Sequence, residues 1–149
     1  MKRVFLDTNV ILDSVLARDN YLSATAILTA GDYKAIDCYV SFLTVANAAY
    51  TLKKGRTAKE MRNLLKDTFD GITVLPMNND QLRLAYEIDA PDFEDVLQYE
   101  CAKAAQCDVI VTSNTKHFKF IDDIDVVSTI DFAKQFKTRK SEDNKNGWS

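Results

Sequence analysis

Short apolar segments alternate with longer segments of helical periodicity along most of this chain. Brief apolar runs bounded by polar or turn residues predict buried strands, whereas apolar residues at i, i+3, i+4 and i+7 predict helices. Strands that alternate with helices are joined by right-handed crossovers, which place helices on both faces of a mostly parallel sheet. The sequence therefore predicts an α/β fold: a three-layer sandwich with a central sheet of about five strands.

The expected elements can be bounded from the same patterns. Strands are predicted over residues 3–6, 34–40, 72–75 and 108–111, with a short fifth around Val126 and Val127. Helices are predicted over residues 10–17, 21–30, 41–54, 78–88 and 91–106, and one more begins after Thr57, which forms a capping box with Glu60. Gly31 is expected to end the second helix, and Pro91 to lie in the first turn of the last.

Two helices carry apolar stripes that are expected to face the core. In the helix over 41–54 the stripe comprises Phe42, Val45, Ala46, Ala49 and Leu52, and in the helix over 91–106 it comprises Phe93, Val96, Leu97, Cys101 and Ala104. The opposite face of the first helix presents Asn47, Tyr50 and Lys54.

Length and composition describe one globular domain. The 149 residues are 46% hydrophobic and 28% charged, and no run approaches the roughly 20 apolar residues of a membrane span. Asp7 comes too early for a signal peptide, so a cytoplasmic protein is expected. We expect one domain over residues 1–137 and a polar, flexible tail over 138–149. The three cysteines lack a Cys-x-x-Cys pair and are predicted to be buried thiols.

The net charge of -3 argues against nucleic-acid binding through an overall basic surface. Binding to an anionic polymer would then need a local basic patch, a metal ion or both. One candidate patch, which can equally be a solvated helix face, comprises Lys53, Lys54, Arg56, Lys59, Arg62 and Lys66.

Three acids occupy positions where chemistry is expected. Asp7 directly follows the first predicted strand, and Asp92 and Asp95 lie three residues apart at the start of the last predicted helix. Each has a structural alternative, because aspartate is a good N-cap and acids in a first turn complement the helix dipole. In a parallel sheet, however, the ends of strands one and four lie side by side, so Asp7, Asp95 and the loop around Asn114 would meet in one cleft.

Such a cluster of carboxylates predicts a divalent metal site. Crowded carboxylates repel one another unless a cation or a proton compensates them, and hard oxygen ligands select Mg²⁺ or Mn²⁺. The lack of a His or Cys cluster argues against zinc. The four glycines form neither a P-loop nor a dinucleotide fingerprint, and the serines lack a histidine partner system. An aspartyl-phosphate phosphatase would want a second acid where Asn9 stands.

The order and spacing of four segments resemble the PIN domain family, whose best-known members are ribonuclease toxins of bacterial toxin-antitoxin pairs. Asp7 in Phe-Leu-Asp-Thr-Asn matches the first acid of the family, and Asp95 in Phe-Glu-Asp-Val-Leu matches the late acid, with Asp92 as its companion. The second acid of the family follows a Ser-x-x-Thr-x-x pattern, and Asn47 takes its place here; Asn114 takes the place of the last acid. Two acids have become amides, which bring no charge and should lower metal affinity.

The resemblance implies an Mg²⁺-dependent endoribonuclease that hydrolyses phosphodiester bonds of RNA and pairs with an antitoxin. Asp7, Asp92 and Asp95 would hold the metal, and Asn47 and Asn114 would orient water or complete its shell. A homodimer is implied, with an antitoxin Arg or Lys in the acidic cleft. The alternative is a catalytically weak module that binds RNA or a protein partner. The residues expected to contact substrate are Thr112, Lys116, His117, Tyr50 and Lys54.

Overall fold

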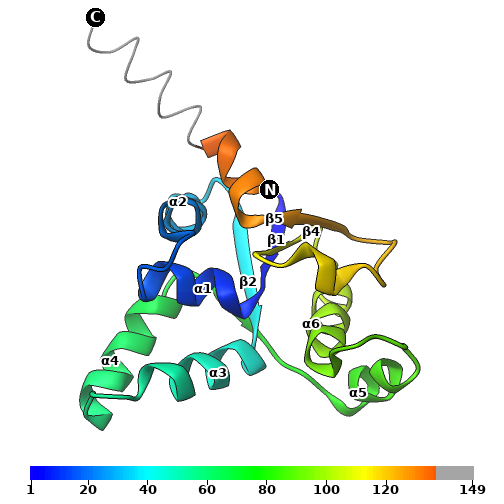
Figure 1. Ribbon diagram of the computed structural model, residues 1–149, viewed down its shortest axis with the longest axis horizontal. Coiled ribbons are helices and arrows are strands. Elements are labelled where there is room, and N and C mark those ends of the chain that lie inside the picture. The colour runs from blue at the N-terminus through cyan, green and yellow to red at the C-terminus, as the bar shows by residue number, and fades with distance from the viewer. Residues whose placement is uncertain (137–149) are drawn as a thin grey trace, which may run out of the picture.

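The sheet has five strands, all parallel, in the order β3-β2-β1-β4-β5 (Figure 1). A computed structural model of the protein describes residues 1–136. The strands are β1 (Arg3–Leu6), β2 (Asp37–Ser41), β3 (Thr73–Leu75), β4 (Val109–Thr112) and β5 (Asp125–Ser128). From β1 the chain first adds β2 and β3 on one side and then adds β4 and β5 on the other side. The strand order therefore shows a reversal between β1 and β4, which lie side by side. In open α/β sheets such a reversal is where ligands bind, at the carboxyl ends of the strands.

Helices cover both faces of this sheet, as the sequence predicted. They are α1 (Thr8–Val15), α2 (Tyr21–Asp32), α3 (Phe42–Leu52), α4 (Ala58–Phe69), α5 (Asn79–Tyr86), α6 (Phe93–Ala104), the 3-10 turn η1 (Thr115–Phe118) and a final helical segment over residues 129–136. Figure 1 shows α1 and α2 on one side of the strands and α5 and α6 on the other. The predicted three-layer α/β sandwich is confirmed.

Successive side chains of a strand point to opposite faces of the sheet, so the core has two layers, one on each face. Val4 and Leu6 of β1 pack in a cluster with residues of α1 and α2, whereas Phe5 packs in a second cluster with Tyr99 of α6. The Val4, Phe5 and Leu6 side chains are fully buried, whereas Arg3 at the start of β1 is half-buried. Because β1 is central and covered on both faces, it has an apolar run from Val4 to Leu6 that ends at Asp7.

A third, smaller cluster joins α1, α3 and α4. It contains Leu12, Leu52 and Met61, and the capping box of Thr57 and Glu60 that starts α4 is present as predicted. The predicted stripe of α3 is wrong in part: Phe42 is 60% exposed, and the buried side chains are Thr44, Ala48 and Leu52. The helix is rotated because Thr44 hydrogen bonds inside the protein, in a polar network described below.

The ends of several elements also differ from the prediction. Gly31 lies inside α2, where a Cβ atom would meet Cys38 Sγ at 2.8 Å, so close packing explains this glycine. Pro91 precedes α6, whose N-cap is Asp92. The stripe predicted for α6 is also shifted, because Phe93 is 41% exposed and Tyr99 is buried.

The remaining predictions on the fold concern the cysteines, membrane-spanning segments and the C-terminal tail. Cys38, Cys101 and Cys107 are free and buried, as predicted. Within the described residues no helix has the length and apolar character needed to cross a membrane. The flexible tail predicted over residues 138–149 lies outside the described part of the chain.

Candidate active site

Asp7 lies where β1 meets β4, at the carboxyl edge of the sheet. Its backbone N–H donates to the Val111 carbonyl at 3.0 Å, which continues the pairing of the two strands past Leu6. Its carboxylate accepts a hydrogen bond from the Thr8 N–H at 2.9 Å and one from the Thr112 hydroxyl at 2.8 Å. Asp7 is the N-cap of α1 and is only 8% exposed. A residue that only caps a helix does not need to be buried. The burial of Asp7 and its second hydrogen bond, from Thr112, fix the position of its carboxylate in addition to the capping role.

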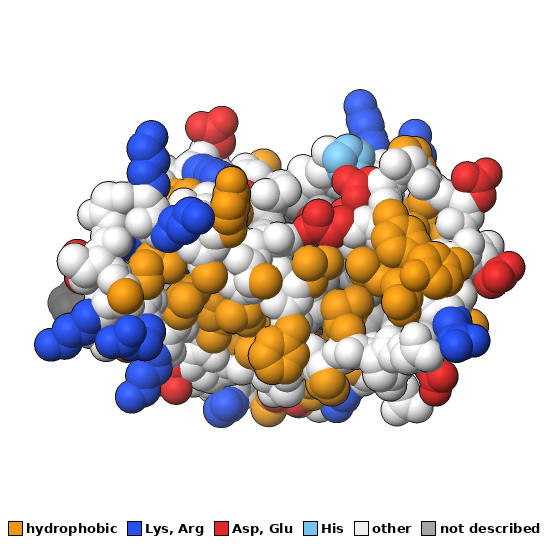
Figure 2. All heavy atoms as spheres, turned by 90° about the horizontal axis from the view of Figure 1, so that it is seen from below, with side chains coloured by type: hydrophobic (Ala, Val, Ile, Leu, Met, Phe, Trp, Pro, Cys, Tyr) orange, Lys and Arg blue, Asp and Glu red, His pale blue; other side chains and the backbone are white. Residues whose placement is uncertain are grey.

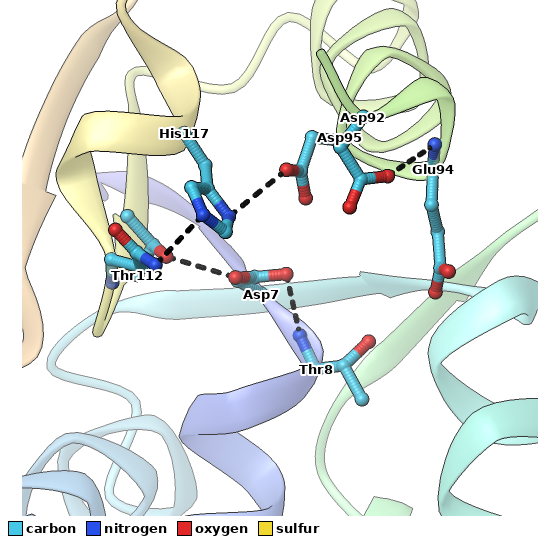
Figure 3. A network of polar contacts seen from close by, with 8 residues as sticks. Asp7, Thr8, Asp92, Glu94, Asp95, Thr112 and His117 are labelled. Atoms are coloured by element: carbon cyan, nitrogen blue, oxygen red, sulfur yellow. Dashed lines mark hydrogen bonds and ion pairs between the residues drawn. The ribbon is translucent and has the colours of Figure 1, made fainter.

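The start of α6 brings the other acids to the same place (Figure 3). Asp92 is the N-cap and accepts a hydrogen bond from the Glu94 N–H at 2.9 Å. One turn further on, Asp95 is 9% exposed, and its Oδ2 atom has no hydrogen-bond partner. The His117 ring lies beside that atom, with its Nδ1 3.4 Å away. Asp95 is therefore the deeper of the two predicted acids of this helix.

These residues line one cleft of about 240 Å³, formed by Asp7, Thr8, Asn9, Asn47, Asp92, Glu94, Asp95, Gln98 and His117. Figure 2 shows it as a hollow in which acidic side chains gather beside the single histidine. The predicted meeting of Asp7 and Asp95 is present. The cleft is open to solvent and strongly acidic, so it suits a cation or a protonated ligand.

Burial and mutual repulsion shift the titration of both buried acids. Burial raises the pKa of Asp95 to about 6, and the negative charges of Asp92 and Asp7 add to the shift. Burial also raises the pKa of Asp7, while its hydrogen bonds from Thr112 and Thr8 oppose that rise. The negative charge of Glu94 raises the pKa of Asp7 and Asp95 alike. A bound cation would relieve this repulsion.

Replacing Asp95 with asparagine is expected to stabilise the metal-free protein at neutral pH. The folded pKa of about 6 exceeds the ordinary aspartate pKa of 3.8, which applies to an unfolded chain, so folding favours the protonated acid. The Asp95 contribution to the free energy of unfolding therefore falls as the pH rises from about 4 to about 6, and stays low above that window. Melting temperatures in chelator should rise for Asp95→Asn at neutral pH and match the wild type near pH 4. A variant that melts below the wild type at neutral pH would contradict this.

A buried polar network supports the floor of the cleft. Gln98 is 1% exposed; its Oε1 accepts from the Ser41 hydroxyl at 2.5 Å, and its Nε2 donates to the Thr44 hydroxyl at 2.9 Å. The Thr8 hydroxyl lies 2.9 Å from that of Thr44 and 3.3 Å from Gln98 Nε2. The network ties the ends of β1 and β2 to α6. It thereby fixes Thr8, whose N–H holds Asp7.

Three predicted site residues contact other side chains of the site in this structure. The buried Thr112 hydroxyl donates a hydrogen bond to Asp7, and Thr112 does not line the cleft. Asn114 does not line the cleft; its Nδ2 pairs with His117 Nε2 at 3.0 Å. The Nδ1 atom of the same ring faces Asp95. Asn47 donates to Glu94 Oε1.

The other predicted substrate contacts lie away from the acids. Tyr50 and Lys54 line a separate groove between α3 and α4 together with Lys53, Arg56 and Met61. The Lys53 ammonium sits 4.6 Å from the centre of the Tyr50 ring. Lys116 is exposed on η1, beside His117. Of the five predicted contacts, only His117 lines the acidic cleft.

The donor chemistry of the cleft fits a divalent cation. Every side chain from α6 that lines it carries an oxygen, and the buried Asp95 Oδ2 makes no hydrogen bond, with His117 Nδ1 3.4 Å away. Asp7, Asp92 and Asp95 surround the cleft without converging: among residues 1–136, no three acidic, histidine or cysteine side chains are grouped tightly enough to hold a metal ion. Oxygen donors of this kind match Mg²⁺ or Mn²⁺.

Four residues that line the cleft were not predicted as site residues: Thr8, Asn9, Glu94 and Gln98. Glu94 lies beside Asp95 in sequence, and the density of acids in Asp-Phe-Glu-Asp was the available signal. Gln98 lies one helical turn after Asp95, so helical spacing places both on one face. A polar amide within an otherwise apolar helix face could have marked it. Its partners, however, come from two other elements that sequence does not bring together.

Known proteins resemble this chain in sequence or in fold. A model of the PIN domain matches residues 3–116. Ribonuclease VapC1 of Aquifex aeolicus (strain VF5) is 30% identical over 146 residues, which cover 92% of this chain and 97% of that protein. FitAcB from Neisseria gonorrhoeae has a similar structure, with a TM-score of 0.66 and 20% identity over 85% of this chain and 98% of that chain.

A toxin-antitoxin complex from Klebsiella pneumoniae is also similar, with a TM-score of 0.60 and 20% identity over 85% of this chain and 97% of the other. At such identities the two structural likenesses concern the fold alone. The PIN domain model and the relative from Aquifex aeolicus also show the family, because each match spans most of the chain. The resemblance predicted from the sequence is confirmed: this chain belongs to the PIN domain family.

Proposed function

We propose that this protein is a metal-dependent endoribonuclease, the toxin of a toxin-antitoxin pair that acts in the cytoplasm. The observation that carries the proposal is the joint burial of Asp7 and Asp95 in one acidic cleft at the carboxyl edge of a parallel sheet. The relative with 30% identity is a ribonuclease, which supports RNA as the substrate. Asp7, Asp92 and Asp95 would hold Mg²⁺ or Mn²⁺.

A divalent ion in this cleft would polarise a phosphoryl oxygen and lower the pKa of an attacking water. The side chains of the protein supply orientation. Thr112 and the Thr8 N–H fix both oxygens of Asp7, so that its free lone pairs face the cleft. His117 lines the cleft beside Asp95, and its exposed ring would be able to donate a hydrogen bond to a phosphate oxygen. Asn114 holds the ring in that orientation.

Cleavage of structured RNA by protein stripped with a chelator tests the proposal. We expect no cleavage in chelator and recovery when Mg²⁺ or Mn²⁺ is added, because the acids alone repel the anionic backbone. Cleavage that persists in chelator would contradict the metal dependence. Binding of RNA without cleavage at any metal concentration would instead support the alternative, a catalytically weak RNA-binding module, which the amides Asn47 and Asn114 favour.

We also propose two protein partners. The similar structure from Klebsiella pneumoniae is a toxin-antitoxin complex, which supports an antitoxin for this chain. Its Arg or Lys would enter the cleft, because carboxylates bind a guanidinium through paired hydrogen bonds. A second copy of the chain is supported by exposed Phe42, Leu84 and Tyr86, since large exposed apolar side chains mark interaction surfaces. Figure 2 shows hydrophobic surface around the acidic hollow. Light scattering should give a dimer; a monomer at all concentrations would refute it.

A further inference from the structure

Glu94 and Asn47 approach the cleft from different helices and meet at its edge. Asn47 Nδ2 donates a hydrogen bond to Glu94 Oε1, and both residues line the cleft. Asn47 is half-buried on α3, whereas Glu94 is exposed in the first turn of α6. Figure 3 shows Glu94 beside Asp92 and Asp95, across the cleft from Asp7. An exposed glutamate is ordinarily free to rotate, but here an amide from another helix holds it in place.

Glu94 adds a negative charge to the lining that it shares with the two buried acids, Asp7 and Asp95. Four carboxylates, those of Asp7, Asp92, Glu94 and Asp95, thus face a common space. Holding a fourth negative charge there costs free energy in the metal-free protein. The buried Asp95 Oδ2 makes no hydrogen bond, although His117 Nδ1 lies 3.4 Å away, and this leaves the oxygen available to a positive ligand.

We propose that Glu94 supplies a further carboxylate to the cation site of this cleft, and that Asn47 is its positioning residue. The inference rests on the proposed metal-dependent function. Asn47 would then act through its N–H group, by orienting Glu94, and would not itself contact the cation. This replaces the role predicted for Asn47 from sequence, which was to orient water or complete the metal shell. In this arrangement the additional carboxylate of the site belongs to Glu94 on α6, and α3, which carries Asn47, contributes only the amide that orients it.

A purely structural role for Glu94 makes the opposite prediction for stability. Glu94 lies in the first turn of α6, where an acid complements the helix dipole, so losing its charge would then destabilise the metal-free protein. If Glu94 belongs to the cation site, removing its charge relieves repulsion from Asp92 and Asp95. The melting temperature of Glu94→Gln in chelator should then be unchanged or raised. The glutamine can still accept the hydrogen bond from Asn47.

Calorimetric titration of Mn²⁺ tests the inference directly. Glu94→Gln should weaken Mn²⁺ binding by roughly tenfold or more, because it removes one charged oxygen ligand or its close support. The matched control is Glu87→Gln, the same change at an exposed acid that does not line the cleft, and it should bind like the wild type. Wild-type affinity in Glu94→Gln would overturn the inference alone. A wild-type protein that binds no Mn²⁺ would overturn the metal-dependent function together with it.

A double-mutant cycle separates the two roles of Asn47. Asn47→Ala should weaken Mn²⁺ binding in the wild-type background, since Glu94 loses its orienting donor. In the Glu94→Gln background the same change should have no further effect, because the group that Asn47 positions is already uncharged. Additive losses in the double variant would show that Asn47 contacts the cation itself, and would overturn the positioning role.

Discussion

Replacing Asp7 with asparagine is expected to lower RNA cleavage by roughly 100-fold or more, with the fold retained. The change removes a negative oxygen from the cleft but keeps the size of the side chain. The remaining Oδ1 can still accept from the Thr8 N–H, and the new amide nitrogen can donate to the Thr112 hydroxyl oxygen, which reverses the direction of the bond that Thr112 makes to Asp7. Loss of one charge also relieves repulsion from Glu94 and Asp95. The melting temperature in chelator should therefore be unchanged or higher.

The control for this variant is Asp13→Asn, on the same helix. Asp13 is also buried, at 7% exposure, but it does not line the cleft. The same chemical change there should leave cleavage within about twofold of the wild type, because surface or structural changes outside a site rarely affect chemistry. Wild-type cleavage by Asp7→Asn would contradict the proposed active site. A large fall in its melting temperature in chelator would mean that Asp7 serves mainly as a helix cap.

Most of the fold could be predicted because its signals are local. The apolar run from Val4 to Leu6 is buried and ends abruptly at Asp7, so its limits are visible in sequence. The capping box at Thr57 is a pattern within four residues. The errors arose where tertiary contacts override local patterns. Gly31 was expected to end a helix, but it lets α2 pack against Cys38. Phe42 was expected in the core, but Thr44 takes that face through its hydrogen bonds.

The candidate site could be predicted only in part, for a related reason. Asp7 and Asp95 follow from where a strand ends and a helix begins, and parallel topology brings those points together. The sequence could not show that Asn47 meets Glu94, since these residues lie on helices whose relative rotation is set by packing. Tyr50 was placed near the acids because it shares a helix with Asn47. The structure puts it in a different groove, one turn further from the sheet edge.

Replacing Gln98 with leucine is expected to lower the free energy of unfolding by about 2–3 kcal/mol, although the volume of the side chain is nearly kept. Leucine leaves the buried Ser41 hydroxyl without its acceptor and deprives Thr44 of a donor, and a stranded buried polar group costs about 1–3 kcal/mol. For a chain of this size the melting temperature should fall by roughly 5–10 °C. Thermal unfolding in chelator measures this without any contribution from metal.

The same replacement at exposed Gln135 supplies the control, with an expected change below about 0.5 kcal/mol. The rate of RNA cleavage by the Gln98→Leu variant distinguishes a network that orients Asp7 from one that only stabilises the core. The network fixes Thr8, and the Thr8 N–H holds Asp7, so Gln98→Leu should lower the cleavage rate even at temperatures where the variant is fully folded. Undiminished cleavage by the folded variant would mean that the network stabilises the fold without orienting Asp7. Unchanged melting would mean that these buried hydroxyls find other partners once Gln98 is gone.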